Sequence, residues 1–126
     1  KGVPPKPDGR LELGRRGEEE AVRYLAAKGY CILDRGFRMF RGEIDIIARL
    51  GETLVFVEVK TRRSTEFGFP DESVNLSKQH QVRKIAQGYL MKKQLPESAT
   101  PCRFDILSVI WAEGRGFAIT HLENAF

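Results

Sequence analysis

Two carboxylates and an ammonium group stand in two otherwise apolar segments near the middle of the chain. Asp45 lies within EIDIIAR at 43–49, and Glu58 and Lys60 end TLVFVEVK at 53–60. Both segments are rich in isoleucine or valine, which favours β-strands. Carboxylate oxygens suit hard cations such as Mg²⁺ or Mn²⁺, and a nearby ammonium group offsets developing negative charge. The combination therefore suits phosphodiester hydrolysis.

The turn between the two strands decides which side chains meet. Glycine at the first central position of the dipeptide GE, at 51–52, suits a two-residue type II′ hairpin. In that register Asp45 lies opposite Glu58, and Glu43 lies opposite Lys60. Directly opposed residues have Cβ atoms about 5 Å apart, so two acids placed there repel each other and need a cation beside them.

Either of two cations can neutralise this repulsion. Lys60 lies two residues beyond Glu58 and so on the same face of the strand. A bound Mg²⁺ or Mn²⁺, held by Asp45, Glu58 and the backbone carbonyl of Val59, is the other candidate. The alternative is an exposed ion-pair cluster at a sheet edge, which contributes little to stability.

The remaining pattern predicts an α/β fold in which helices flank a mixed sheet. Gly14 and Gly17, inside the first predicted helix, mark either a frayed start of that helix or a place where its backbone closely approaches another group. Ser77 is the predicted N-cap of the second helix. A helix between two strands favours a parallel crossover, so an antiparallel meander should be followed by a parallel strand. Helices are predicted over 10–28 and after residue 77, further strands at 30–37, 103–111 and 116–122, and a loop at 67–75.

Composition predicts one domain over residues 10–126, preceded by a flexible lead-in over 1–9 that holds three prolines and two glycines. No apolar run approaches the ~20 residues that span a bilayer, so we expect no membrane association and a cytoplasmic location. Two cysteines cannot form a structural zinc site, which needs about four ligands.

The charge balance permits a polyanionic partner. The formal net charge is +4 and the pI is about 9.3, a mild basic bias that also fits an ordinary solvated surface. Several basic residues stand beside the candidate site in sequence, where they can contact phosphates of nucleic acid, and the predicted set is Arg38, Arg41, Arg62, Arg63 and Lys78.

The motifs GEIDIIA at 42–48 and LVFVEVKTR at 54–62 resemble the PD-(D/E)xK nuclease signature. With GRRGEEEAVRYL, GYCIL, RFD and the closing HLENAF, the chain resembles the YraN family of small predicted endonucleases, which are similar to archaeal Holliday-junction resolvases. Ile44 replaces the proline that names the motif.

The resemblance implies a restriction-endonuclease-like αβββαβ core. It implies metal ligands at Asp45 and Glu58, a catalytic lysine at Lys60, and Glu18 as a further acid that completes the site. The expected activity is metal-dependent cleavage of DNA, in branched or single-stranded regions. A two-fold homodimer is expected by analogy only.

Two other functions remain open. The same fold can act as a nucleic-acid-binding or repair-associated module without chemistry, or as an interaction protein whose charged cluster is only an ion network.

Overall fold

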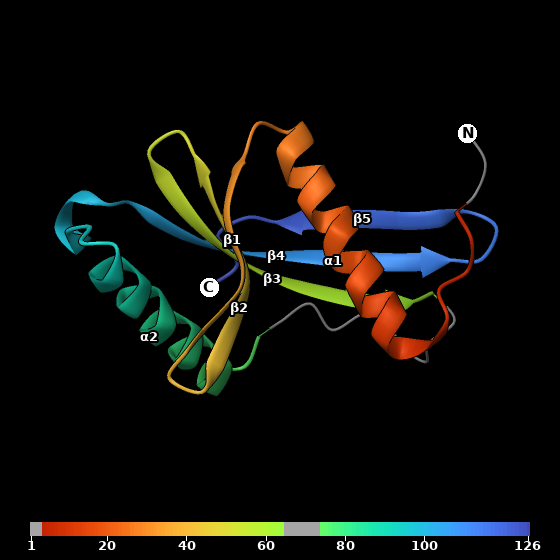
Figure 1. The fold of residues 1–126 in the computed structure, drawn as a ribbon, viewed down its shortest axis with the longest axis horizontal. Coiled ribbons are helices and arrows are strands. Elements are labelled where there is room, and N and C mark those ends of the chain that lie inside the picture. Colours follow the sequence, from red (N-terminus) through yellow and green to blue (C-terminus); the bar gives the residue numbers. More distant parts are fainter. Residues whose placement is uncertain (1–3, 65–73) are drawn as a thin grey trace.

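The computed structural model describes residues 4–64 and 74–126, which form one sheet and two α-helices (Figure 1). The predicted loop at 67–75 lies mostly outside the described residues. In chain order the elements are α1 (Gly9–Ala27), β1 (Cys31–Met39), β2 (Gly42–Leu50), β3 (Thr53–Arg63), α2 (Leu76–Lys92), a 3₁₀ turn (Glu97–Ala99), β4 (Cys102–Ala112) and β5 (Gly116–Leu122).

The sheet has five strands in the order β1-β2-β3-β4-β5. Neighbours are antiparallel except β3 and β4, which run parallel and are joined through α2. The predicted α/β fold and its mixed sheet are thus confirmed. The parallel pair has a helix in its connection, as is usual for parallel crossovers.

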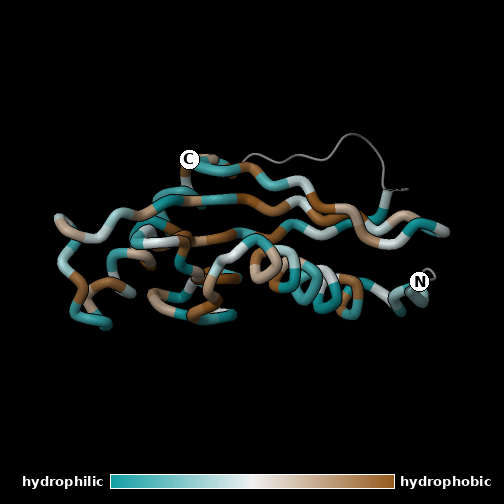
Figure 2. Tube along the Cα trace, turned by 90° about the horizontal axis from the view of Figure 1, so that it is seen from above, coloured by the Kyte–Doolittle hydropathy of each residue, from teal (hydrophilic) through white to brown (hydrophobic). Residues whose placement is uncertain are grey.

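The two helices cover opposite faces of the sheet. Val55 and Val57 on β3 pack with Leu25 of α1, whereas Phe56, between them in sequence, packs with Tyr89 of α2. Successive strand residues point to opposite faces, so one apolar run supplies both cores. Figure 2 shows hydrophobic residues concentrated along the strands, while hydrophilic and hydrophobic residues alternate along α1.

The start of α2 differs from its prediction. Asn75, not Ser77, is the N-cap, and its side-chain oxygen accepts a hydrogen bond from the Lys78 N–H at 2.8 Å. Both residue types cap helices well, and the earlier one is used here. The apolar residues of this helix recur at helical spacing and face the core, since Val82, Ile85 and Tyr89 are buried.

Residues 4–8 of the predicted lead-in contact the domain. Pro7 is buried, and its carbonyl oxygen accepts a hydrogen bond from Arg63 at 3.3 Å. Arg16 on α1 donates to the Pro5 carbonyl in the same way. The helix itself begins at Gly9. Within the described ranges, neither helix has the length and apolarity needed to cross a membrane.

A buried ionic network joins β4 to the C-terminal residues. Asp105 is fully buried and accepts two hydrogen bonds from Arg103, at 2.8 and 2.9 Å, and one from the Asn124 N–H at 2.9 Å. His121 Nε2 lies 2.7 Å from the same carboxylate. Burial raises the pKa of Asp105, but these hydrogen bonds outweigh it, and the net pKa lies below its usual range.

We expect Asp105→Ala to lower the free energy of unfolding at pH 7 by about 3–5 kcal/mol, because Arg103 and the Asn124 N–H lose the buried carboxylate that accepts their hydrogen bonds. Because the folded-state pKa is depressed, this stabilisation is present above about pH 4 and is lost as pH falls through the folded-state pKa. Urea denaturation at pH 7 and at pH 3 measures both effects. Glu52→Ala, in an exposed turn, should stay within about 0.5 kcal/mol of wild type.

Candidate metal and nucleic-acid site

The β2–β3 hairpin has the predicted register as far as the site. Gly51 adopts a left-handed φ of 62°, and the ladder continues to Ile46 opposite Val57. At Asp45, the next residue of β2, the pattern changes, because its Oδ2 accepts the Val59 N–H at 2.8 Å. The described β2–β3 ladder ends there, while β3 continues beside β4 to Arg63. The carboxylate therefore lies where the two strands part.

Glu58 lies close enough to Asp45 for its charge to disfavour ionisation of the Asp45 carboxyl group. Burial raises the pKa of Asp45 to about 7, and the negative charge of Glu58 is the second cause. The Val59 N–H favours the ionised form, while Glu18 and Glu43 add smaller upward contributions. The charge of Glu58 thus acts on Asp45, whose pKa lies near neutral pH, although the described ladder ends one residue before the predicted direct pairing of the two acids.

Two lysines face Glu58. Burial raises the pKa of its carboxyl group, and Lys78 and then Lys60 act against that shift. Lys78 Nζ lies 4.0 Å from Glu58 Oε2. The first turn of α2 thus supplies a positive charge to an acid on β3. Lys60, two residues along β3, is on the same face as Glu58, as its spacing predicted.

Gly17 sets the position of α1 against β3. A Cβ at this glycine would overlap the side chain of Thr61, the residue after Lys60, so only glycine permits this contact. The close approach predicted for Gly17 is thus confirmed, whereas Gly14 faces open space. The next residue of α1, Glu18, is near enough to Asp45 to raise its pKa.

The two outer acids are paired with arginines. Glu18 Oε1 lies 3.6 Å from Arg35 Nη2, and Glu43 Oε1 lies 3.3 Å from Arg38 Nη2. Glu43 is opposite Arg38 in the β1–β2 ladder, and the β2–β3 ladder does not extend to the predicted pairing of Glu43 with Lys60. Strand β1 therefore supplies counter-charges that the sequence did not assign to these acids.

The donor set at the centre of the site fits a hard divalent cation. Asp45 and Glu58 are half-buried carboxylates with raised pKa values, and a cation between them removes the repulsion that raises the pKa of Asp45. Within residues 4–64 and 74–126, no three His, Cys, Asp or Glu side chains are grouped closely enough to hold a metal.

The remaining predicted basic residues are spread along the strand ends. Arg41 forms the exposed β1–β2 turn with Phe40, and both take positive φ values, 62° and 55° respectively. Non-glycine residues rarely adopt this conformation, so the turn is strained. Arg62 and Arg63 end β3, and both are half-buried. The structure thus places Arg41 in the β1–β2 turn and Arg62 and Arg63 at the end of β3.

Sequence reasoning missed the partners of His121. This histidine contacts Asp105 through Nε2, and its Nδ1 lies 3.3 Å from the Tyr24 hydroxyl. Tyr24 and His121 are far apart in sequence, so no local pattern identifies the contact. Asp105, which accepts hydrogen bonds from Arg103 and from the Asn124 N–H, is a structural acid.

Fold and site together define an α/β protein whose mixed five-stranded sheet is consistent with a restriction-endonuclease-like core, with paired acids where its second and third strands separate. The model of "Uncharacterised protein family UPF0102" matches residues 17–109, and the chain belongs to this family. This bears out the resemblance to YraN proteins at the level of the family.

Relatives match over nearly their whole length. A UPF0102 protein of Alkaliphilus oremlandii is 49% identical over 115 residues, covering 91% of this chain and 97% of the relative. One from Dictyoglomus turgidum is 46% identical over 116 residues, with coverage of 91% and 97%. One from Thermodesulfovibrio yellowstonii is 44% identical over 119 residues, covering 93% and 97%.

We expect Asp45→Asn to stabilise the protein at pH 8 by about 1–3 kcal/mol and to have little effect at pH 4. The folded-state pKa, raised to about 7, exceeds the unfolded value, so the wild type loses stability as pH rises from about 4 through 7. Asparagine keeps an acceptor for the Val59 N–H but carries no charge. Chemical denaturation of both proteins across this range, in metal-free buffer, measures the difference. Equal stability at pH 8 contradicts the predicted repulsion.

Proposed function

We propose that this protein is a metal-dependent nuclease of the PD-(D/E)xK superfamily, acting on DNA. The observation that carries the proposal is the pairing of Asp45 with Glu58 at the point where β2 leaves β3, with Lys60 on the same strand. Structural acids are normally neutralised by partners inside the protein, whereas burial and then the charge of Glu58 raise the pKa of Asp45, in a site with adjoining ammonium groups. Such an arrangement suits the binding of a divalent cation between the acids and of an anionic substrate beside it.

The protein's own residues would act in three ways. Asp45, Glu58 and the carbonyl of Val59 would hold Mg²⁺ or Mn²⁺, which supplies a Lewis acid and an activated water when bound. The Val59 N–H holds Asp45 Oδ2 at 2.8 Å and so fixes the direction of one carboxylate. Lys60 offsets negative charge that develops on the phosphate oxygens.

Lys78 and the arginines would position the nucleic acid. Lys78 Nζ, 4.0 Å from Glu58, can turn from this carboxylate toward a phosphate, because it is only partly buried and the ion pair is loose. Arg38 on β1, Arg41 in the β1–β2 turn and Arg62 near the end of β3 would add positive charge for this contact. Such contacts set register along a strand without reading its sequence.

The cleavage test compares wild type with Lys60→Ala on branched, single-stranded and duplex DNA, with Mg²⁺ or Mn²⁺. Removing a group that stabilises transition-state charge should lower the cleavage rate by about 10²- to 10³-fold. Lys93→Ala removes an exposed lysine at the far end of α2 and should cleave at the wild-type rate. Absence of cleavage on all three substrates, or equal cleavage by Lys60→Ala, would refute the nuclease proposal.

Metal binding gives a separate prediction. We expect saturating Mn²⁺ to raise the free energy of unfolding of the wild type by about 2–3 kcal/mol, as binding at ~100 times Kd does, and to leave Glu58→Gln unchanged. Thermal unfolding with and without Mn²⁺ at pH 8 gives the comparison. Glu52→Gln, an exposed acid in the hairpin turn, is the matched control and should respond as the wild type does. A response in Glu58→Gln equal to that of wild type places the metal elsewhere.

One observation favours a second function, a nucleic-acid-binding module without chemistry. In the described part of the chain Glu18 and Glu43 each form an ion pair with an arginine, and only Asp45 and Glu58 remain as close acids. A module of this kind binds DNA in a salt-dependent way that survives Asp45→Asn and cleaves none of the substrates above.

A further inference from the structure

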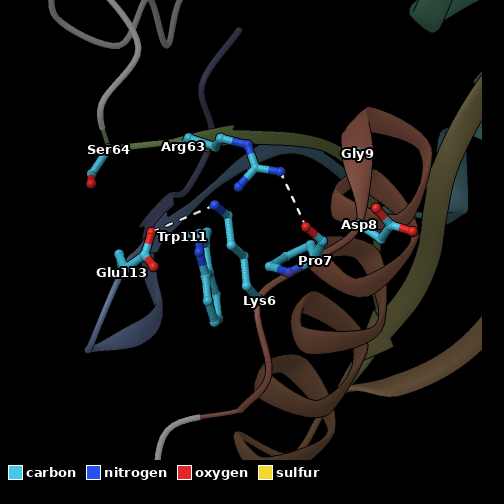
Figure 3. A pocket seen from close by; sticks show the side chains of 8 residues that line it. All are labelled: Lys6, Pro7, Asp8, Gly9, Arg63, Ser64, Trp111 and Glu113. Atoms are coloured by element: carbon cyan, nitrogen blue, oxygen red, sulfur yellow. Dashed lines mark hydrogen bonds and ion pairs between the residues drawn. The ribbon is translucent and has the colours of Figure 1, made fainter.

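A cavity of about 630 Å³ lies between the segment that precedes α1 and the ends of β3 and β4 (Figure 3). Lys6, Arg63, Trp111 and Glu113 are among its lining residues. It is separate from the Asp45–Glu58 pair, which does not line it. Its size falls in the range of about 300–1,000 Å³ that is typical of ligand sites.

The indole of Trp111 carries a donor without an acceptor. This side chain is only 3% exposed, and its Nε1 is buried and makes no hydrogen bond within residues 4–64 and 74–126. Buried donors are nearly always paired, so an orphan donor on a residue that lines a cavity indicates an acceptor that the described part of the chain does not supply. Lys6, which lines the same cavity, is highly exposed.

The charges around this donor favour an anion. Lys6 and Arg63 line the cavity, and the Arg16 guanidinium lies 5.4 Å from the centre of the Trp111 ring. Of the two acids, Glu113 forms a loose, exposed pair with Lys6 at 3.9 Å, and the Asp8 carboxylate points away from the cationic groups in Figure 3.

The beginning of α1 adds partial positive charge to this cavity. Its N-cap, Asp8, makes no side-chain capping hydrogen bond, and Gly9 lines the cavity. The N-terminal end of a helix carries partial positive charge and exposes backbone N–H groups, both of which attract anions. Guanidinium groups bind phosphate oxygens with two parallel hydrogen bonds, so phosphate is the anion that this set of groups fits best.

We propose that this cavity binds a backbone phosphate of a nucleic-acid strand that extends along β3 beyond the Asp45–Glu58 pair. Naming nucleic acid as the source of the phosphate rests on the proposed function. Arg63 is three residues beyond Lys60 on the same strand, a separation of ~10 Å at ~3.3 Å per residue. This span corresponds to about two or three nucleotides of a duplex strand, whose phosphates advance ~3.4 Å each along the axis.

Because β2 separates from β3, a nucleic-acid strand can contact residues 60–63 of β3 on both faces of the sheet. Lys60 and Arg63 point to opposite faces of β3, because their positions differ by an odd number. The described β2–β3 ladder ends at Val57, so β2 does not flank residues 60–63. A strand that follows this edge of β3 meets Lys60 on one face and the cavity on the other.

Trp111 itself reports on the cavity, because it is the only tryptophan in the chain. The test titrates the protein, in buffer with EDTA, with an eight-nucleotide single strand, a 5′-mononucleotide or inorganic phosphate, and follows tryptophan emission. We expect the oligonucleotide to change the emission at concentrations at least tenfold below the other two, since several phosphates bind together. A mononucleotide that binds as tightly as the oligonucleotide overturns the assignment to a nucleic-acid strand.

Variants separate this cavity from general electrostatics. Lys6→Ala should weaken oligonucleotide binding by roughly 3- to 10-fold and reduce its salt dependence by about one phosphate, as loss of one phosphate contact does. Lys93→Ala changes the net charge by the same amount at a distant exposed position and should bind as the wild type does. Unchanged Trp111 emission on oligonucleotide binding, or equal weakening by both variants, overturns the proposal.

The two proposals fail separately. Cleavage plays no part in the EDTA titration, so a protein that cuts DNA but gives no Trp111 response refutes the cavity alone. A Trp111 response in a protein that fails to cleave refutes the nuclease and leaves the phosphate site.

Discussion

Repulsion between two carboxylates organises the centre of this protein. Asp45 and Glu58 lie in strands whose neighbours are buried and apolar, and the lysines of the site, Lys78 and Lys60, lie beside Glu58. The surrounding structure reduces the cost of this pair without removing it. The Val59 N–H binds one acid, Lys78 and Lys60 lie near the other, and the pKa of Asp45 still rises to about 7.

A comparison of Asp45 with Asp105 shows what partial compensation means. Both are aspartates within strands, and burial raises the pKa of each. At Asp105, hydrogen bonds from Arg103, Asn124 and His121 exceed that effect and lower the pKa, which is the pattern of a structural acid. At Asp45 one backbone N–H opposes burial and a second carboxylate, and the pKa moves upward, as at many functional sites.

Each helix contributes one charged group to the central pair because the helices lie on opposite faces of the sheet. Glu18 comes from α1, whose distance from β3 is set by the contact of Gly17 with Thr61. Lys78 comes from the first turn of α2, which Asn75 caps. A site at the place where β2 leaves β3 can receive both groups, whereas a site in the middle of a fully paired sheet is covered by core side chains on each face.

The sequence determined the elements and the hairpin register. A glycine at 51 fixes a tight turn, the side-chain period of two then decides which residues face each other, and the apolar stripe of α2 decides which side of that helix is buried. These are local relations, so they can be predicted from spacing. The assignment of metal ligands and of catalysis at Asp45, Glu58 and Lys60 stays a prediction.

Only the tertiary structure decided which distant groups neutralise each acid. Arg35 pairs with Glu18, Arg38 with Glu43, and His121 with Asp105, and the cavity at Trp111 combines the segment before α1 with the ends of β3 and β4. Long side chains have many rotamers and several candidate partners in a sequence with 30% charged residues. Packing of the helices and strands selects among those partners, and this selection depends on contacts that sequence spacing does not specify.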